Sequence, residues 1–388
     1  MSRPHPSRLG RFVHVACSSL VGAVLSVLLA ACGGGSGGTD QPARSTYAFG
    51  RIAGFGSIVV NGVHFDETSA RIQDEDGVDH ARGELGLGMM VEVEADDSAH
   101  AHDIRFLSLM RGPVESVATS SLVVLGQTVS VNATTVFDDS MAGGLAAIKP
   151  GMVVRIFGLL DTSGSYTATR IDSPSTTSYA LLGFVTAVDA TAKTLSIGNA
   201  LIDVSAAPLP NGTAVGSLVR VKLQTTKVNG AWVAINVRSG MRHPPEGDHA
   251  EIEGVVTDFT STKSFSVDGT PVDASNASFP DGTTGLTKGA RVEVEGAFVA
   301  GVLVATKVEI ESEDEMEAEG LEVDGVITAV NTVNSTIVVH AVTVSYAGAV
   351  DFVGGTAMDL LVGAKVEVHG SLAADGTTLN ATRIRFEH

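Results

Sequence analysis

The sequence predicts an all-β protein, a tandem array of five small five-stranded Greek-key barrels, and three observations support this. Gly, Val, Thr and Ala are abundant while aromatic residues make up only 5% of the 388 residues, a composition typical of many strands and turns. Apolar and polar residues alternate over short runs, as in half-buried strands. Two signatures recur in the same order five times after residue 48, which indicates a repeat architecture.

The two signatures and a closing strand set the repeat boundaries. The first signature is a glycine followed by alternating apolar residues, and it starts at Gly50, Gly112, Gly183, Gly254 and Gly325. The second is a glycine followed by a strand of the Val-Glu-Val type, and it starts at Gly88, Gly151, Gly216, Gly289 and Gly363. A strand of the Ala-Thr-Arg-Ile type closes most units. The predicted repeats are 49–109, 110–173, 179–239, 250–310 and 321–388.

The fourth repeat shows the expected order of elements most clearly. Alternation predicts three strands, at 252–259, 264–267 and 270–273. Asp268-Gly269 predicts a tight hairpin between the last two, as Asn61-Gly62 does in the first repeat. A polar stretch able to hold a short helix, such as 141–148, precedes the final two strands. This β-β-β-short helix-β-β order matches an OB-like barrel, and the glycine in each first strand suits the bend that such a barrel needs.

The start of the chain is similar to a bacterial lipoprotein signal peptide. Basic residues are followed by an apolar run over 21–30, which is too short to be a convincing membrane span. Leu29-Ala30-Ala31-Cys32 resembles the lipobox, which implies cleavage after residue 31 and attachment of a diacyl lipid, with palmitate among its acyl chains, to Cys32. The Gly/Ser-rich segment 32–48 then predicts a flexible tether. By the same resemblance, Gly33 after the cysteine favours the outer membrane.

Charge and cysteine content exclude some classes of partner. Removal of residues 1–31 would leave 22 basic and 44 acidic side chains, a formal charge of −22. Such a chain repels phosphate backbones, so no nucleic-acid partner is expected. Cys17 would be lost with the signal peptide and Cys32 would carry lipid, so the mature chain would have no disulfide. Its stability would come from packing alone.

The joints between repeats differ in composition. Residues 240–249 contain Pro244-Pro245 and predict a semi-rigid linker, and the acidic residues 311–320 predict a linker extended by self-repulsion. A Ser/Thr-rich joint lies at 174–178. We therefore expect self-contained units on an extended chain. This arrangement favours a spacer or multivalent binding role over catalysis.

The repeats resemble Domain of Unknown Function 5666, a bacterial family found repeatedly in glycine-tethered lipoproteins. The resemblance is carried by residues 50–66, Gly-Arg-Ile-Ala-Gly-Phe-Gly-Ser-Ile-Val-Val-Asn-Gly-Val-His-Phe-Asp, and by the Val-Glu-Val and Ala-Thr-Arg-Ile signatures of the other repeats. On these residues the first repeat is the closest match, and the third, which lacks Val-Glu-Val-x-Gly, is the most divergent. The resemblance implies location and architecture and brings no established activity.

Histidines of the first repeat offer a candidate metal site. His100 and His102 would share one face of a strand, a spacing compatible with zinc or copper, and His64 or His80 would have to complete the site. No other repeat has this pair, so a solvated hairpin tip is the alternative interpretation.

Acidic segments offer weaker candidates. Asp74-Glu75-Asp76-Gly77 with Asp79 looks like a fragment of a calcium loop but lacks the later bidentate glutamate, so we interpret it as a polar turn. The acids at 311–319 could collect divalent cations weakly, although a solvated spacer is the simpler interpretation. Trp232, at the start of the last strand of the third repeat, is interpreted as a packing residue and not as a ring on which a bound sugar stacks.

Catalytic signatures are absent from the sequence. After the Gly/Ser-rich tether it contains no Gly-x-Ser-x-Gly elbow, His-Glu-x-x-His helix, phosphate loop or dinucleotide fingerprint. No catalytic residue and no cofactor besides the lipid on Cys32 is therefore predicted. The favoured prediction is a non-enzymatic, lipid-anchored envelope protein that binds polysaccharide or protein or acts as a spacer. A metal-binding lipoprotein and a hydrolase with dispersed carboxylates remain alternatives.

Overall fold

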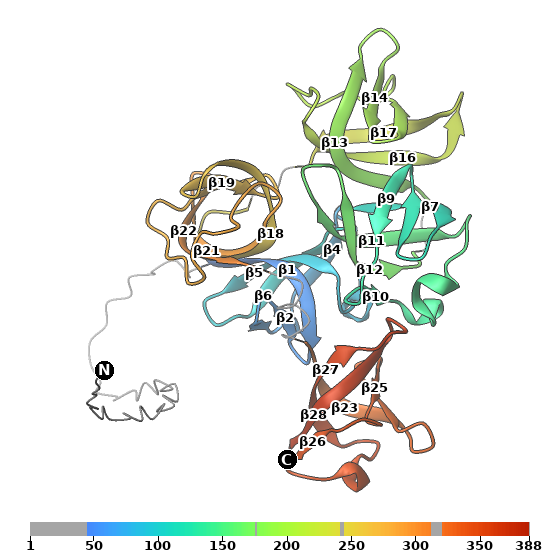
Figure 1. Ribbon diagram of the computed structural model, residues 1–388, viewed down its shortest axis with the longest axis vertical. Coiled ribbons are helices and arrows are strands. Elements are labelled where there is room, and N and C mark those ends of the chain that lie inside the picture. Colours follow the sequence, from blue (N-terminus) through green and yellow to red (C-terminus); the bar gives the residue numbers. More distant parts are fainter. Residues whose placement is uncertain (1–44, 175–176, 241–243, 312–319, 388) are drawn as a thin grey trace, which may run out of the picture. The chain divides into compact units, whose positions relative to one another are not determined.

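The computed structural model describes residues 45–174, 177–240, 244–311 and 320–387 (Figure 1). The predicted signal peptide and Cys32 therefore lie outside the described residues. In the first two repeats the elements are β1 (Ser45–Phe55), β2 (Ile58–Val60), β3 (Val63–Phe65), β4 (Arg71–Asp74), η1 (Arg82–Glu84), β5 (Met90–Asp96), β6 (Ala101–Phe106), β7 (Met110–Val117), β8 (Ser121–Val124), β9 (Gln127–Ser130), β10 (Val136–Phe137), η2 (Asp139–Met141), η3 (Gly144–Ala147), β11 (Val153–Leu160) and β12 (Tyr166–Asp172).

The other three repeats follow the same order. Their elements are β13 (Tyr179–Asp189), β14 (Thr194–Ile197), β15 (Ala200–Asp203), β16 (Leu218–Val228), β17 (Ala231–Ser239), β18 (Gly247–Ser261), β19 (Ser264–Val267), β20 (Thr270–Asp273), β21 (Arg291–Val299), β22 (Val302–Ile310), β23 (Leu321–Asn331), β24 (Thr336–Val339), β25 (Val342–Ser345), β26 (Asp351–Val353), η4 (Ala357–Asp359), β27 (Lys365–Leu372) and β28 (Thr378–Glu387). None of the helices in the described ranges is long and apolar enough to cross a bilayer.

The all-β class is confirmed, but the prediction of five separate OB-like barrels with short helices is wrong. The strands are arranged as a β-solenoid of about 9 turns, with 58% of the residues in strands. They join into a 17-stranded and an 11-stranded sheet, and both sheets cross repeat boundaries. β1 of the first repeat pairs in parallel with β18 of the fourth and β23 of the fifth, and β7 pairs with β13. Because strands of different repeats pair with each other at their edges, the repeats are not separate structural units.

The buried side chains explain why the repeats join. They form two core clusters instead of five: one draws mainly on the first, fourth and fifth repeats, and the other on the second and third. Each repeat has only about 60 residues, near the lower limit for a self-sufficient core, so sharing a core removes more apolar surface from water.

The predicted short helix at 141–148 is also absent. The 3₁₀ turns η2 and η3 occupy this region instead. Gly143 and Gly144 have φ values of 102° and 63°, left-handed conformations that an α-helix does not contain.

The two predicted hairpin turns are confirmed. Asn61-Gly62 and Asp268-Gly269 all have positive φ, as the mirror-image turns between twisted strands require. The first-strand glycine makes room for these turns: a Cβ at Gly254 would lie 2.9 Å from Cγ of Asp268. The recurring glycine therefore permits close approach of the hairpin, a role that the bend-based interpretation missed.

Candidate functional site

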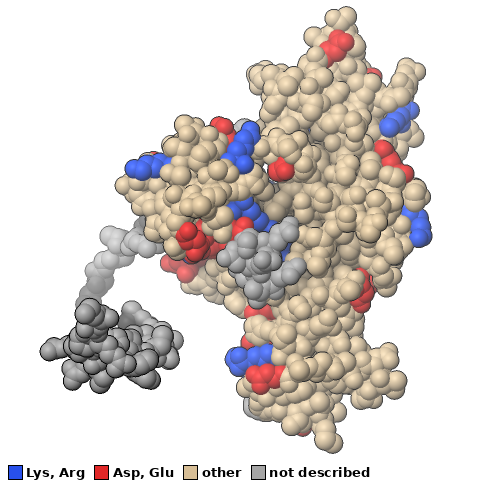
Figure 2. All heavy atoms as spheres, viewed as in Figure 1, with Lys and Arg blue, Asp and Glu red and all other residues tan. Residues whose placement is uncertain are grey.

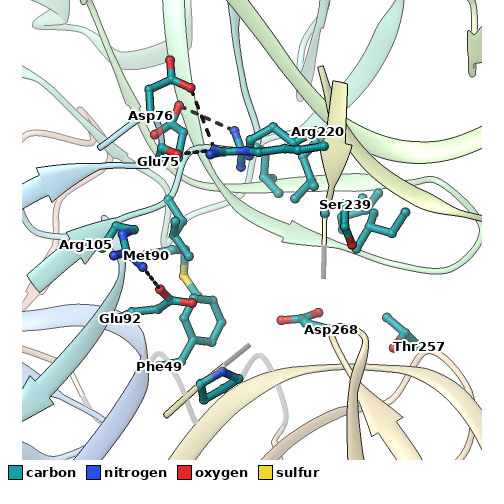
Figure 3. A pocket seen from close by; sticks show the side chains of 18 of the residues that line it. Phe49, Glu75, Asp76, Met90, Glu92, Arg105, Arg220, Ser239, Thr257 and Asp268 are labelled. Carbon is teal, nitrogen blue, oxygen red and sulfur yellow. Dashed lines mark hydrogen bonds and ion pairs between the residues drawn. The ribbon is translucent and has the colours of Figure 1, made fainter. Parts of the chain in front are cut away.

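The candidate site is a cavity of about 480 Å³ lined by residues of the first four repeats (Figure 3). This volume lies within the range of small-molecule and peptide sites, roughly 300–1,000 Å³. Strands β1, β5, β13 and β16 supply much of its wall. Its apolar wall includes Phe49, Met90, Leu107, Leu182 and Phe184. The described lining contains no histidine, cysteine or lysine.

The acidic turn after β4 forms one end of this cavity. Asp74 folds the turn, because its Oδ1 accepts hydrogen bonds from the backbone N–H groups of Asp76 and Val78, both at 2.9 Å. Only 5% of Asp74 and 3% of Glu75 is exposed. The segment is a polar turn, as predicted, but it is buried, and its carboxylates bind protein groups where those of a calcium loop would bind an ion.

Glu75 binds residues that lie far along the chain. Its Oε1 accepts a hydrogen bond of 2.6 Å from Oγ of Ser108 and lies 3.5 Å from Nη1 of Arg220. Arg220 also donates through Nη2 to the backbone oxygen of Ser108. Burial lowers the pKa of Arg220, and the Glu75 carboxylate opposes that shift. The pair therefore fixes the third repeat against the first.

Asp76 extends this network at the cavity wall (Figure 3). Its Oδ2 lies 3.0 Å from Nζ of Lys222 and 3.4 Å from Nη2 of Arg111, and its Oδ1 lies 3.9 Å from Nη2 of Arg238. Burial alone would raise the pKa of Asp76, but the neighbouring cations lower it below its ordinary value. Asp76 is therefore held as a carboxylate.

β5 and β6 contribute a second charged wall. Glu92 and Arg105 lie opposite each other in the ladder, with Nη1 of Arg105 3.2 Å from Oε2 of Glu92. Glu94 instead lies opposite Asp103. Burial and repulsion from Asp103 raise the pKa of Glu94. The described lining thus has more carboxylates than guanidinium groups, and the pKa of Glu94, unlike that of Asp76, is raised.

The charged residues of this region occupy one recurring position. The two polar residues of the second signature are Glu92 and Glu94 in β5, and Arg220 and Lys222 in β16. The corresponding pair in β21 is Glu293 and Glu295, and in β27 it is Glu367 and His369. One strand position, varied between repeats, therefore supplies carboxylates in the 17-stranded sheet and cations in the 11-stranded sheet.

The predicted metal pair is exposed at the β5–β6 hairpin. Nδ1 of His100 lies 3.4 Å from Oδ1 of Asp96, and His102 is exposed on β6. His80 lies elsewhere, between Asp74 and Glu84, at 3.4 Å and 2.8 Å. Within the described ranges, the groups with three close ligand atoms are Glu322, Glu367 and His369, and Glu251, Glu293 and Glu295. The His100 and His102 site stays a prediction.

Two further sequence predictions concern the acidic joint and Trp232. Residues 312–319 of the acidic joint lie outside the described residues. Trp232 is 5% exposed, packs edge-on against Tyr179 with ring centroids 5.6 Å apart, and lies under Lys227. Its interpretation as a packing residue is confirmed. On the face shown in Figure 2, Lys and Arg side chains are scattered among acids and neutral surface.

The structure and a comparison with protein families define the class of protein, an all-β protein of tandem repeats. A family model for Domain of unknown function (DUF5666) matches residues 111–172, 253–309 and 324–385. These regions fall in the second, fourth and fifth repeats. The chain is therefore a DUF5666-like tandem-repeat protein. The expectation that the first repeat is the closest match is wrong, since the model does not match it. No curated protein matches the chain.

Proposed function

We propose that the chain is a non-enzymatic binding protein of the bacterial outer membrane, anchored by a lipid on Cys32, whose ligand occupies the cavity between the first four repeats. The observation that carries the ligand site is the cavity itself, which combines apolar walls with charged groups held in fixed positions. The lipobox-like segment supports the anchor.

The chemistry of the cavity favours a protein segment over a polysaccharide. Glu75 and Asp76 already bind cations of the protein, and Glu92 binds Arg105. Glu94 is left beside the like-charged Asp103, so a basic group of the ligand would lower the electrostatic cost there. Leucine and phenylalanine walls suit apolar side chains. The ligand is therefore an extended segment with alternating apolar and basic residues.

A binding role is preferred to the alternatives. A spacer needs units that extend away from one another, whereas β1 of the first repeat pairs with strands of the fourth and fifth. A hydrolase needs two carboxylates poised for acid and base catalysis. In the described lining Glu75, Asp76 and Glu92 are instead neutralised by basic side chains.

The proposal predicts charge-selective peptide binding. The full chain in phosphatidylcholine nanodiscs should bind a fluorescein-labelled peptide of alternating leucine and lysine saturably, as measured by fluorescence anisotropy. Leu107→Trp, which fills the cavity from its wall, should weaken binding at least about tenfold, or about 1.4 kcal/mol.

Two controls separate this result from non-specific binding. Val215→Trp places the same side chain at a site that is 67% exposed and outside the lining, and should leave the affinity unchanged. A peptide of alternating leucine and glutamate should bind at least about tenfold more weakly than the lysine peptide. Equal binding of the two peptides, or undiminished binding by Leu107→Trp, would contradict the proposed site.

A further inference from the structure

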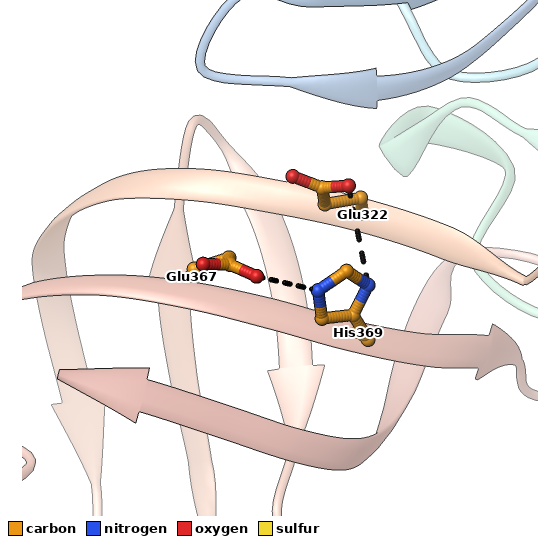
Figure 4. Close-up of side chains that lie close together, drawn as sticks. All are labelled: Glu322, Glu367 and His369. Carbon is orange, nitrogen blue, oxygen red and sulfur yellow. Dashed lines mark hydrogen bonds and ion pairs between the residues drawn. The ribbon is translucent and has the colours of Figure 1, made fainter. Parts of the chain in front are cut away.

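The first and fifth repeats meet at a group of histidines and glutamates separate from the cavity. Glu367 and His369 alternate along β27 and therefore share a face of the sheet. Glu322 of β23 lies directly opposite His369 in the antiparallel ladder. Figure 4 shows these three side chains pointing toward one another. His64, on β3 of the first repeat, lies with its Nε2 3.9 Å from Oε2 of Glu322.

Backbone pairing fixes the approach of the two repeats. β1 and β23 pair in parallel with Gly54 opposite Glu322. A Cβ at Gly54 would lie only 2.9 Å from the backbone oxygen of Glu322, so the glycine permits this close contact. The positions of His64 and Glu322 therefore follow from a strand ladder and not from surface side chains alone.

The distances suit a bound ion better than direct hydrogen bonds. Oε2 of Glu322 lies 3.9 Å from Nε2 of His64 and 3.9 Å from Nδ1 of His369. Hydrogen bonds of this kind are roughly 2.7–3.2 Å long. Ligands of a tetrahedral zinc ion, each about 2.1 Å from the metal, lie roughly 3.4 Å apart. The ligand atoms of Glu322, Glu367 and His369 lie within 4.8 Å of one another, so an ion that links the two repeats requires the exposed His64 to move in toward this group.

The second nitrogen of each imidazole already has an orienting partner. Nδ1 of His64 lies 3.1 Å from Oγ of Ser57. Nε2 of His369 lies 2.6 Å from Oε1 of Glu367, whose Oε2 accepts a hydrogen bond of 3.0 Å from Arg385. Metal-binding histidines regularly donate their other N–H to a carboxylate or another acceptor, which sets the tautomer and the ring orientation.

We infer that His64, Glu322 and His369 form a site for a divalent transition-metal ion of the zinc type, with Ser57 and Glu367 as positioning residues. Two imidazoles and one carboxylate are ligands that zinc accepts, leaving a fourth position for water, whereas Ca²⁺ and Mg²⁺ prefer oxygen ligands alone. The site goes beyond the peptide-binding role and involves neither His100 nor His102. A bound ion would link the first and fifth repeats.

The test uses the full chain in nanodiscs after removal of metal with EDTA. Equilibrium dialysis against ZnCl₂ should show one tightly bound Zn²⁺ per chain, and Co²⁺ should give the visible absorption of a tetrahedral site. His64→Gln and His369→Gln should each weaken Zn²⁺ binding at least about tenfold, and Glu367→Gln should do so by roughly 10–100-fold through the orientation of His369.

The matched control is the double variant His100→Gln/His102→Gln, which should bind Zn²⁺ as the parent does. Circular dichroism of each metal-free variant checks that it folds, which we expect because the side chains of His64 and His369 are 52% and 41% exposed. The inference is overturned if the parent binds no Zn²⁺ saturably, if His64→Gln and His369→Gln bind it undiminished, or if only the His100/His102 control loses binding.

Discussion

Replacement of Glu75 by alanine is expected to lower the free energy of unfolding of the second and third repeats, which share a core, by about 3–5 kcal/mol, because it leaves Arg220 buried without the Glu75 carboxylate. Arg220 is 7% exposed and Glu75 3% exposed, so water cannot take the place of the lost partner. Trp232 is the only tryptophan and lies in β17 of the third repeat, so its fluorescence during urea unfolding reports this change.

Two further variants identify the cause of the loss. Asp79→Ala removes the partner of Arg71, but that pair is more than half exposed, so it should cost far less stability than Glu75→Ala. The double variant Glu75→Leu/Arg220→Met removes both buried charges and should recover much of the stability that Glu75→Ala loses. If Glu75→Ala is no more destabilising than Asp79→Ala, the network between the first and third repeats does not form.

Raising the pH from 5 to 9 is expected to destabilise the part of the chain that contains the fourth repeat and the repeats sharing its core by on the order of 2 kcal/mol. Glu251 on β18 and Glu293 on β21 lie close together with Glu295. Burial and repulsion from Glu295 raise the pKa of Glu251 to about 7, and burial and repulsion from Glu251 raise the pKa of Glu293 to about 8. Glu309 and Glu311 add repulsion, while Lys307 opposes it.

The sign follows from proton linkage. Both folded-state pKa values are above those of the unfolded chain, so the folded state holds the protons more tightly and loses stability as pH rises from about 4.5 to 8. Because Glu293 is only partly buried, solvent screening reduces the full effect, and our figure includes that reduction. Thermal unfolding followed by circular dichroism at each pH measures the change.

A charge-removing variant tests the assignment of this pH dependence. Glu251→Gln/Glu293→Gln should flatten the stability profile between pH 5 and 9. Asp273→Asn should leave it unchanged, because hydrogen bonds from Ser275 lower the pKa of this exposed carboxyl and keep its titration below the window. A profile that stays equally steep in the double glutamine variant would refute the role of the pair.

Local sequence signals predicted local structure well. The strands expected at 264–267 and 270–273 are β19 and β20 with the same bounds, and Asp268-Gly269 forms the turn between them. Hairpins of this kind depend on a few neighbouring residues, so their signal is contained in the sequence window itself.

Pairing between repeats left no local signal. The parallel ladder of β1 and β18 joins residues about 200 positions apart, and alternation within a strand does not specify which edge it meets. One signal could have located the buried network. Arg220 and Lys222 stand where the fourth repeat has Glu293 and Glu295, so the third repeat carries the cations that bind Glu75 and Asp76.

The measurement that tests the envelope-binding account most directly is intact-mass spectrometry of the protein extracted from the membranes of a diderm bacterium, beside a Cys32→Ala variant. The account predicts a chain that begins at Cys32 and carries a diacyl lipid, with the variant uncleaved and without lipid. A soluble product without lipid from the parent sequence would contradict the anchor and with it the proposed place of binding.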